Sequence, residues 1–377
     1  MVKVLVTDGA NRVALAVVRA LGRAGAEVAV VEQECFAQKT PASFRSRFVS
    51  RHDVIPTLSG DGAFFDALVE RAAGFDVLLP VSTNVALACA AQRDRLPARL
   101  PIPPLATLRR ANDKSAALAV ARKSGVPIPV TYAPEDDEEL EEVLAKLRYP
   151  AVVKLRDDAD TVLEPVQRYS IGRTADDVRR AYRRLQAIKP FPLIQQKVDG
   201  PGYGVGVLAD GGRVRAAFAH RRIREYPVTG GPSTVCVSVV DERLVAYASS
   251  VIGELGWTGV AMVEFKKDDD YRLMEVNPRF WGSLPLATHA GVNFPDLLCR
   301  QAMGEEIKGP KAYPADLRLR FLPLDAAAAW SALRDPERRW SYPLGFLGDL
   351  LDVRMIDGIL DPGDLEASLL YLANHLP

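Results

Sequence analysis

Residues 256–285 constrain the fold of this chain more than any other stretch, with the sequence GWTGVAMVEFKKDDDYRLMEVNPRFWGSLP. The run 260–266 is rich in β-forming side chains, a polar Lys-Asp-Asp-Asp turn follows, and 271–277 return as a second strand, which predicts a β-hairpin. Folding the hairpin about the middle of its turn places Glu264 almost opposite Glu275. Directly opposed residues lie about 4.5–5.5 Å apart at Cβ, where like charges destabilise the pair.

A divalent cation between the two carboxylates would relieve this repulsion. Side chains alternate along a strand, so Asn277 shares a face with Glu275. Two carboxylates and an amide oxygen form an all-oxygen set that suits Mg²⁺, usually with phosphates completing its shell. The alternative is that one glutamate points to solvent and the pairing is accidental. Pro278 ends the strand and Arg279 adds a fixed cation, which favours a metal–phosphate site.

The composition argues against several classes of protein. The charges balance at 48 basic and 48 acidic residues, which disfavours an extended nucleic-acid or anionic-membrane surface. No apolar run approaches the ~18–20 residues that span a bilayer, and the N-terminus leads directly into a strand without a signal-peptide pattern. The four cysteines and four histidines are scattered, so we expect reduced core cysteines, a cytoplasmic protein and no zinc site.

The N-terminal region reads as a β-α-β unit. A strand over 2–8, a helix capped by Asn11 and a strand over 27–32 predict a parallel, right-handed start without the GxGxxG pattern of dinucleotide sites. A later core strand ends just before Thr83 and Asn84, at the edge where open α/β sheets bind ligands. Helix capping is the alternative interpretation of these two side chains.

The hairpin motif resembles a known family. The order strand-Glu, turn, strand-Glu-x-Asn-x-Arg, as VEF…LMEVNPRFWGS, is similar to the metal-binding end of the ATP-grasp ligases, which include the carbamoyl-phosphate synthase large chain and biotin carboxylase. The resemblance covers roughly residues 1–310 and implies an ATP-grasp fold of mixed α/β and α+β character. It implies a Rossmann-like domain (1–104), a small lobe (105–195) and a large lobe with the metal site (196–310). Outside the resemblance, helical patterns predict a helical C-terminal appendage over 311–377.

The resemblance implies two phosphate-binding lysines. Lys114 follows Asn-Asp at a helix start, where a cation is poorly placed against the helix dipole unless it serves an anion. Lys154 ends the strand PAVVK, although an apolar strand often ends in a lysine that only extends to solvent. Similar proteins then have a glycine- and serine-rich flap. This chain has Asp157, Asp158 and Asp160, which would repel a triphosphate unless they turn outward or bind metal.

The resemblance also implies an adenine-binding hinge and basic side chains near the transferred phosphoryl group. The hinge contacts are expected from Gln195, Gln196 and Val198, and an acidic residue often stands in similar proteins where Gln196 stands. Arg222 and Arg224 are expected on one face of a later strand, because they are two residues apart. A solvated basic edge is the alternative for these two arginines.

The resemblance implies an ATP- and Mg²⁺-dependent ligase that activates a carboxylate as an acyl phosphate and joins it to an amine or similar nucleophile. In this reading Glu264, Glu275 and Asn277 bind Mg²⁺, Lys114 and Lys154 bind phosphates, and Arg279, Arg222 and Arg224 stabilise the transferring group. The partners are then small-molecule carboxylate and amine substrates, with a possible homodimer and no nucleic acid or membrane. The alternative is a nucleotide-binding regulatory or scaffold protein without turnover, which the aspartate-rich segment favours and the intact hairpin motif opposes.

Overall fold

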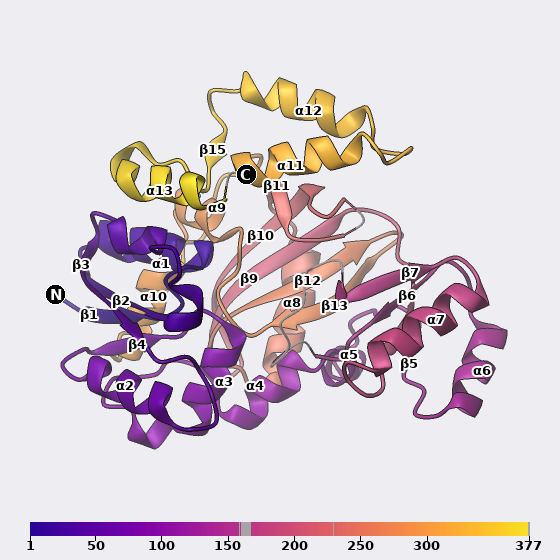
Figure 1. Cartoon of the computed structure of the whole chain (residues 1–377), viewed down its shortest axis with the longest axis horizontal. Coiled ribbons are helices and arrows are strands. Elements are labelled where there is room, and N and C mark those ends of the chain that lie inside the picture. Colours follow the sequence, from indigo (N-terminus) through magenta and orange to yellow (C-terminus); the bar gives the residue numbers. More distant parts are fainter. Residues whose placement is uncertain (158, 160–166, 229, 376–377) are drawn as a thin grey trace.

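The computed structural model describes residues 1–157, 159, 167–228 and 230–375, to which every structural statement below refers. An N-terminal α/β unit and a small α+β lobe lie on opposite sides of a large twisted sheet, and the C-terminal helices lie along one end of it (Figure 1). No described helix has the length and apolar character that crossing a membrane requires.

The N-terminal unit is built on a parallel sheet in the order β3-β2-β1-β4, as the β-α-β pattern predicts. Its strands and helices are β1 (Lys3–Val6), α1 (Arg12–Arg23), β2 (Glu27–Gln33), β3 (Val49–Ile55), α2 (Ala63–Ala72), β4 (Val77–Leu79) and α3 (Thr83–Ala91). Asn11 caps α1 by accepting the N–H of Val13, as predicted. Because β1 and β4 are parallel neighbours, the helices that follow them, α1 and α3, begin at the same edge of the sheet.

The small lobe is an antiparallel sheet in the order β5-β8-β6-β7, with two helices packed on it. Its elements are β5 (Thr131–Tyr132), α6 (Asp137–Lys146), β6 (Ala151–Lys154), β7 (Tyr169–Gly172), α7 (Ala175–Gln186) and β8 (Leu193–Gln196). Thr174 and Asp177 form a capping box at the start of α7. Val153 and Ile194 on the sheet bury their side chains against Leu140 and Tyr182 on the helices, so the lobe has a core of its own.

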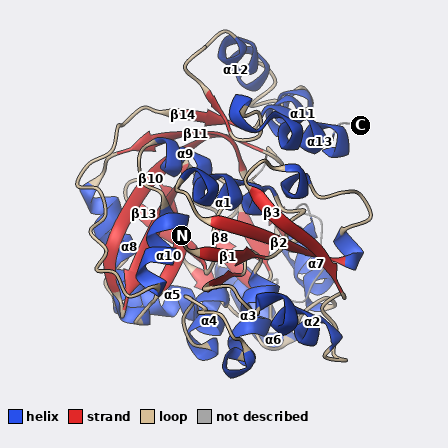
Figure 2. Cartoon of the chain, turned by 90° about the vertical axis from the view of Figure 1, so that its left-hand side faces the viewer, coloured by secondary structure: helices blue, strands red, loops and turns tan. Residues whose placement is uncertain are grey.

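The large sheet has seven strands in the order β13-β12-β9-β10-β11-β14-β15, and all neighbours are antiparallel except β14 and β15. Its strands are β9 (Gly202–Asp210), β10 (Arg213–Glu225), β11 (Ser233–Val239), β12 (Gly259–Lys267), β13 (Tyr271–Asn277), β14 (Arg318–Arg320) and β15 (Ile356–Asp357). The helices around it are α4 (Leu105–Asn112), α5 (Lys114–Lys123), α8 (Glu242–Leu255), α9 (Leu284–His289) and α10 (Phe294–Ala302). Figure 2 shows the molecule turned by 90°, so that the N-terminal unit with its parallel sheet faces the viewer.

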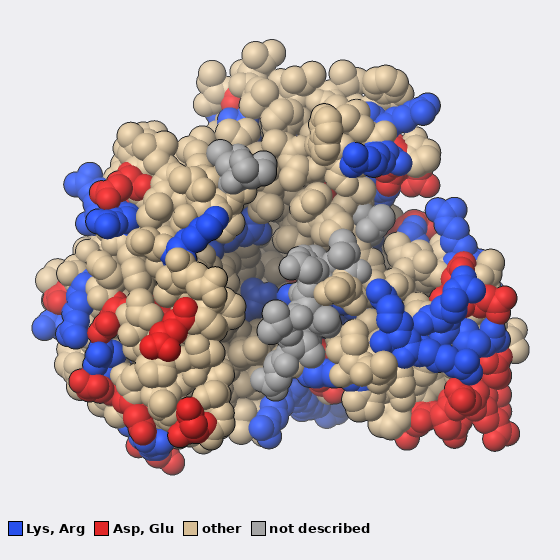
Figure 3. Space-filling view, in the orientation of Figure 1, with Lys and Arg blue, Asp and Glu red and all other residues tan. Residues whose placement is uncertain are grey.

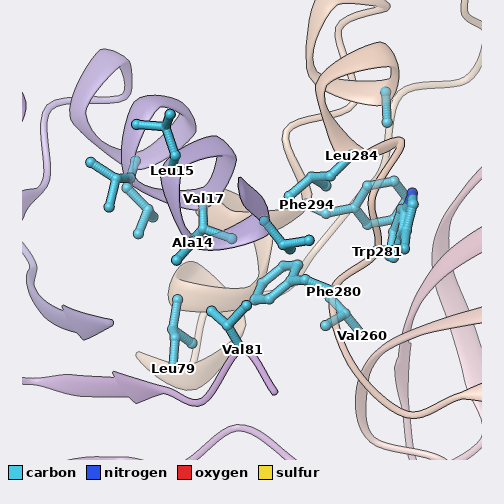
Figure 4. Packing of buried hydrophobic residues seen from close by; sticks show 14 of the residues in the cluster. Ala14, Leu15, Val17, Leu79, Val81, Val260, Phe280, Trp281, Leu284 and Phe294 are labelled. Carbon is cyan, nitrogen blue, oxygen red and sulfur yellow. The ribbon is translucent and has the colours of Figure 1, made fainter. Parts of the chain in front are cut away.

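The two faces of β12 bury different neighbours, because side chains alternate along a strand. Ala261, Val263 and Phe265 pack in the cluster that includes α5 and α8. Val260 and Met262 pack in the opposite cluster, which includes α1 and Trp281 (Figure 4). Glu264 is two residues after Met262, so its side chain lies on the same face of β12 as Val260 and Met262. This face is turned toward the N-terminal unit.

The ring of Trp281 packs closely against β9 because the strand has a glycine at the point of contact. A Cβ on Gly206 would lie 2.1 Å from Cζ2 of Trp281, closer than two carbon atoms can approach. Gly204 makes a similar close approach to the ring of His220, with a Cβ position 2.4 Å from Cε1. These glycines therefore serve packing, and the fully buried Trp281 joins the N-terminal unit to the large sheet.

The C-terminal residues are not wholly helical, contrary to the expected helical appendage. They contribute two strands, β14 and β15, to the edge of the large sheet, beside α11 (Leu322–Ala332), α12 (Ser341–Leu350) and α13 (Leu365–His375). The pairing of β14 with β11 buries Leu319 completely. A three-residue strand is too short to give a periodic pattern, so the sequence did not indicate it.

Candidate functional site

Glu264 and Glu275 are directly paired across the β12–β13 hairpin, as the sequence predicts. Two residues further along the same pair of strands, Met262 lies opposite Asn277. The amide Nδ2 of Asn277 donates to Oε1 of Glu264 at 2.9 Å and lies 3.4 Å from Oε1 of Glu275. One amide therefore reaches both carboxylates, and the three side chains converge on one point of the sheet.

Three cations from three different elements surround this point. Nζ of Lys114, at the start of α5, is 3.5 Å from Oε2 of Glu275. Arg222 on β10 forms an ion pair with Glu264. Lys154 at the end of β6 donates to the carbonyl oxygen of Met274 at 3.5 Å. The small lobe, the large sheet and α5 thus each supply one positive charge to the hairpin.

Burial and neighbouring charges shift the pKa values of these groups in different directions. Burial raises the pKa of Glu264, against the lowering effect of Arg222. Burial acts in the same direction on Glu275, but Lys114, Lys154 and Arg222 lower its pKa to about 2. Burial also lowers the pKa of Lys154 to about 8, although the charge of Glu275 opposes the change. Two carboxylates with opposite shifts indicate a pair that would gain from additional positive charge.

The donor set fits Mg²⁺. Glu264 and Glu275 provide carboxylate oxygens on one face, and Asn277 between them provides an amide whose oxygen and nitrogen exchange places when the side chain rotates. Oxygen ligands of this kind are those that Mg²⁺ prefers. These three residues are therefore the ones that would hold the ion.

A pocket of about 360 Å³ opens beside the hairpin, between the N-terminal unit and the large sheet. Figure 3 shows a hollow in the middle of the molecular face, with Lys and Arg atoms visible inside it. The pocket is lined by Asn11, Arg12, Val13, Ser82, Thr83, Asn84, Ala159, Arg168, His220, Arg222, Pro232, Ser233, Met262, Glu264, Asn277, Arg279, Trp281, Gly282 and Ser283. The hairpin forms one end of it, and the starts of α1 and α3 form another part of its wall.

Arg279 lies in the pocket wall next to the hairpin. Its Nη1 donates to the carbonyl oxygen of Phe280 at 2.8 Å, and its Nη2 lies 3.4 Å from Oδ1 of Asn277. The guanidinium is thus held beside the proposed metal ligands, where the sequence places it. A planar cation in this position can contact a phosphoryl group bound at the hairpin.

A buried histidine–serine pair also lines the pocket. Nε2 of His220 and Oγ of Ser283 are 3.0 Å apart. Burial lowers the pKa of His220 to about 3, and the neighbouring charge of Arg222 adds to this effect. The imidazole is therefore neutral at physiological pH and offers hydrogen bonds rather than charge.

Arg224 does not reach the site, and the expectation that it shares a face with Arg222 is wrong. The register of β10 against β11 shifts between these two arginines, so a bulge turns Arg224 away from the pocket. Its guanidinium donates to both carboxylate oxygens of Asp325 at 2.8 and 2.7 Å and to Asp349 at 2.5 Å. Arg224 is 4% exposed and holds α11 and α12 against the sheet.

The expected adenine contacts lie on the small lobe, at and just after the end of β8. The side chain of Gln195 is buried and donates to Oγ1 of Thr131 at 2.8 Å, within its own sheet. The backbone N–H of Gln196 donates to the carbonyl oxygen of Val130, and Val198 is buried beyond the strand end. None of these three residues lines the described pocket, so their contact with a nucleotide base stays a prediction.

The aspartate-rich segment is described only in part. Asp157 forms an ion pair with Lys189 at 2.5 Å, so its charge is compensated within the small lobe. Asp158 and Asp160 lie outside the described residues.

At the start of α3 the sequence predicted either helix capping or ligand contact. Ser82 provides the cap by accepting the N–H of Val85. Thr83 and Asn84 line the pocket.

Sequence reasoning missed Arg12, His220 and Ser283 as pocket residues. Arg12 is the first residue of α1, after the carboxyl end of β1, at the same kind of position that drew attention to Thr83. Applying that rule to both strands would have found it. His220 and Ser283 gave no such signal, because each is a single polar residue in an apolar stretch and they meet only in the folded chain.

Comparisons with known proteins bear on the fold of this chain. A family model described as "ATP-grasp in the biosynthetic pathway with Ter operon" matches residues 189–323. Among curated protein sequences, none matches the chain significantly. Several hundred solved chains resemble it in structure.

Three of these structures illustrate the likeness. Biotin carboxylase from Campylobacter jejuni has a TM-score of 0.66 and 17% identity, with 84% of this chain and 74% of that chain covered. L-amino acid ligase from Bacillus licheniformis has a TM-score of 0.62 and 18% identity, with 80% and 74% covered. The biotin carboxylase domain of 2-oxoglutarate carboxylase from Hydrogenobacter thermophilus, solved with MgADP and bicarbonate, has a TM-score of 0.67 and 18% identity, with 84% and 73% covered.

Proposed function

Because the chain has the ATP-grasp fold, we propose that it is an ATP- and Mg²⁺-dependent ligase that activates a carboxylate as an acyl phosphate and joins it to an amine or similar nucleophile. The observation that carries this proposal is the pairing of Glu275 with Glu264, which lines a pocket. Lys114 and Arg222 lie against these carboxylates, and Lys154 lies close to them. Such a cluster has the charges that hold a metal–triphosphate complex.

The nucleotide would lie between the small lobe and the large sheet. Lys114 and Lys154 bind its phosphates, and Gln195, Gln196 and Val198 lie on the side of the small lobe proposed for the adenine base. Glu264, Glu275 and Asn277 would hold Mg²⁺, which would supply positive charge against that of the transferring phosphoryl group.

The chemistry requires positioning and charge more than a protein nucleophile. A carboxylate oxygen of the substrate attacks the γ-phosphorus, the bond to the β,γ-bridging oxygen breaks, and ADP leaves. The amine then attacks the acyl carbon, inorganic phosphate leaves with the bonding pair, and the amine loses a proton. Arg279 stabilises the phosphoryl oxygens through its guanidinium, while Arg222 holds Glu264 in place. Arg224 has no part in these steps.

The names of the similar structures support this assignment. Biotin carboxylase and L-amino acid ligase are among the similar structures. A third, the biotin carboxylase domain of 2-oxoglutarate carboxylase, holds MgADP and bicarbonate. We extend to this chain the use of ATP, Mg²⁺ and small-molecule substrates. A cytoplasmic location and a homodimer are parts of the same proposal, and one similar structure is described as a dimer.

The test combines binding with turnover. The melting temperature of the full chain is measured with ATP, with Mg²⁺ and with both, and ADP release is then followed over a panel of carboxylates paired with amines. We expect Mg²⁺-dependent stabilisation by ATP and ADP release with at least one pair. Stabilisation without ADP release on any pair would instead support a nucleotide-binding regulatory protein, and no Mg²⁺-dependent stabilisation would overturn both assignments.

A further inference from the structure

The C-terminal helices α11 and α12 pack on each other and present an apolar outer surface. Large apolar side chains are exposed on both helices and on the residues that flank them. These side chains, which we call the apolar face, are Trp330, Leu333, Trp340, Leu344, Leu347, Leu350, Leu351 and Val353. Figure 3 shows a mostly uncharged area at the top of the molecule, where Figure 1 places α12.

Helical spacing gathers the exposed side chains of α12 into one stripe. The stripe consists of Trp340, Leu344, Leu347 and Leu351. Intervals of four, three and four residues place these side chains one above another along the helix. A stripe of this kind normally faces the core of a protein, but here it faces outward.

The inner side of α12 carries its one charged residue. Within α12, all of whose residues the structure describes, only Asp349 is buried. Its carboxylate accepts from Arg224 at 2.5 Å and pairs with Arg318 at 2.8 Å. Arg320 donates to its carbonyl oxygen at 2.9 Å. The helix is therefore fixed with its carboxylate inward and its leucines outward, the reverse of a surface helix on a monomeric protein.

We propose that the apolar face binds a second copy of this chain, so that α11 and α12 of two protomers pack against each other about a two-fold axis. This inference gives the homodimer of the proposed function its interface, and to that extent rests on it. A two-fold contact uses the same surface on both protomers, which is the commonest arrangement of homodimers.

The size of the apolar face matches what a stable dimer needs. The exposed fractions of its residues run from 45% for Leu350 to 98% for Val353. With ~200 Å² for a whole aromatic side chain and ~100 Å² for a whole aliphatic one, the face exposes roughly 700 Å² of apolar surface. The largest apolar patch on a typical monomer has about 300–600 Å². Each partner in a standard interface buries about 800 Å², which is close to the area of this face.

The charges of the two helices favour a protein partner over a lipid surface. Neither α11 nor α12, both fully described, contains a lysine or an arginine. Helices that lie on membranes carry these residues along their polar face. The charged side chains nearby belong to the loop 334–339, at one edge of the apolar face. Because the face itself is uncharged, it can meet its own copy without like-charge repulsion.

Gly348 lies within the stripe of α12, between Leu347 and Leu351. It is exposed, and a Cβ built on it would have no other atom within 4 Å. A glycine at this point lets a second helix approach closely, since the distance between packed helices depends on the side chains at the contact. A larger side chain at position 348 therefore fits a single protomer but occupies the space that a partner needs.

The mass of the full chain in solution tests the proposal. Sedimentation velocity is measured without nucleotide over a range of protein concentrations. We expect a species with twice the 41.1 kDa of one chain. An interface of this size predicts a dissociation constant of about 1 μM or tighter.

Variants assign the dimer to the apolar face. Gly348→Glu and Leu347→Glu each place a carboxylate in the middle of the stripe. Both should raise the dissociation constant by about 100-fold or more, because the carboxylate would be buried without a partner. Gly348→Glu should leave the protomer folded, since its site is open, and a cooperative melting transition checks this. Leu369→Glu makes the same change on the exposed side of α13 and should keep the dimer.

The outcomes separate this inference from the proposed function. A wild-type chain that keeps the mass of one protomer up to about 100 μM overturns the inference. A dimer that persists in both Gly348→Glu and Leu347→Glu overturns the assignment to this face. Co-sedimentation with vesicles of phosphatidylcholine and phosphatidylglycerol is the second measurement. If the wild-type chain is monomeric and binds them while Gly348→Glu does not, the face belongs to a lipid surface and the inference is overturned. ADP release tests ligase activity by itself, whatever the mass.

Discussion

Arg222 and Arg224 are two residues apart on β10, yet they belong to opposite kinds of charge cluster. Arg224 donates to Asp325 and Asp349, and Thr234 donates to Asp325 at 2.9 Å, so the charges of this cluster are paired with one another. Arg222 pairs with Glu264 at the pocket wall, and its Nε is buried without a hydrogen-bond partner among the described residues.

The difference teaches how to separate a structural ion cluster from a functional one. In the closed cluster one arginine meets two carboxylates with good geometry, and none of the three lines the pocket beside the hairpin. In the open cluster, two carboxylates face each other with opposite pKa shifts, beside a pocket. Groups held in an unsatisfied arrangement next to a cavity are the pattern of a binding site.

The largest expected effect concerns the closed cluster. Asp325→Ala leaves Arg224 buried with part of its charge uncompensated, which should lower the free energy of unfolding by about 3–5 kcal/mol. Urea unfolding measures this change. The affinity for Mg·ATP should change far less, because Asp325 lies outside the pocket. A variant with wild-type stability and weakened nucleotide binding would reverse the comparison.

In the open cluster the loss should fall on activity. Glu275→Gln should reduce Mg²⁺-dependent turnover by about 10²–10³-fold, the effect of removing one charge-stabilising group, and leave the fold intact. Initial rates of ADP release at several Mg²⁺ concentrations measure this loss. Glu142→Gln, on the exposed face of α6, makes the same chemical change away from the site and should behave as wild type. Wild-type turnover in Glu275→Gln would remove Glu275 from the site.

His220 gives the open cluster a pH signature in stability. Its folded pKa is about 3, because of burial and of Arg222, while the ordinary value is 6.5. Between these values the unfolded chain binds a proton that the folded chain does not, so stability falls as the pH is lowered. The slope is up to about 1.4 kcal/mol per pH unit. Urea unfolding at pH 7, 6 and 5 should show a smaller slope in His220→Gln, and identical slopes would contradict the pKa shift.

The smallest effect is expected at a solvent-exposed ion pair. Its coupling energy is the reference against which the buried charge pairs are compared. Arg179 on α7 contacts Glu141 on α6 at 2.6 Å. A double-mutant cycle with alanine at both positions should give a coupling close to zero, because water and salt screen exposed charges. The same cycle for Arg224 and Asp325 should give a clearly larger coupling. Similar values would mean that burial does not separate these pairs.

Local pattern was sufficient to predict much of the molecule. The polar turn after Lys266 fixed the register of the hairpin, and so the pairing of Glu264 with Glu275 could be found from the sequence. The cap at Asn11 and the parallel β-α-β start followed in the same way. These features depend on residues that are close together in the chain.

The rest depends on long-range contacts that no local pattern contains. The bulge that turns Arg224 away is visible only in the pairing of β10 with β11, and its partner Asp325 is 101 residues later. Arg12 enters the pocket wall only because Gly282 passes beside it. The strand β14 gains its place by pairing with β11.

The contacts of Arg19, further along α1, limit where this chain can be shortened. Arg19 donates to Asp364 at 2.9 Å, to the carbonyl oxygen of Ile359 at 2.9 Å and to Ser368 at 2.9 Å. The helix that brings Arg12 to the pocket is therefore anchored by the C-terminal segment. A truncated chain ending at residue 310 would retain all the proposed ligands and lose this anchor, so a minimal catalytic fragment cannot be defined from the motif-bearing region alone.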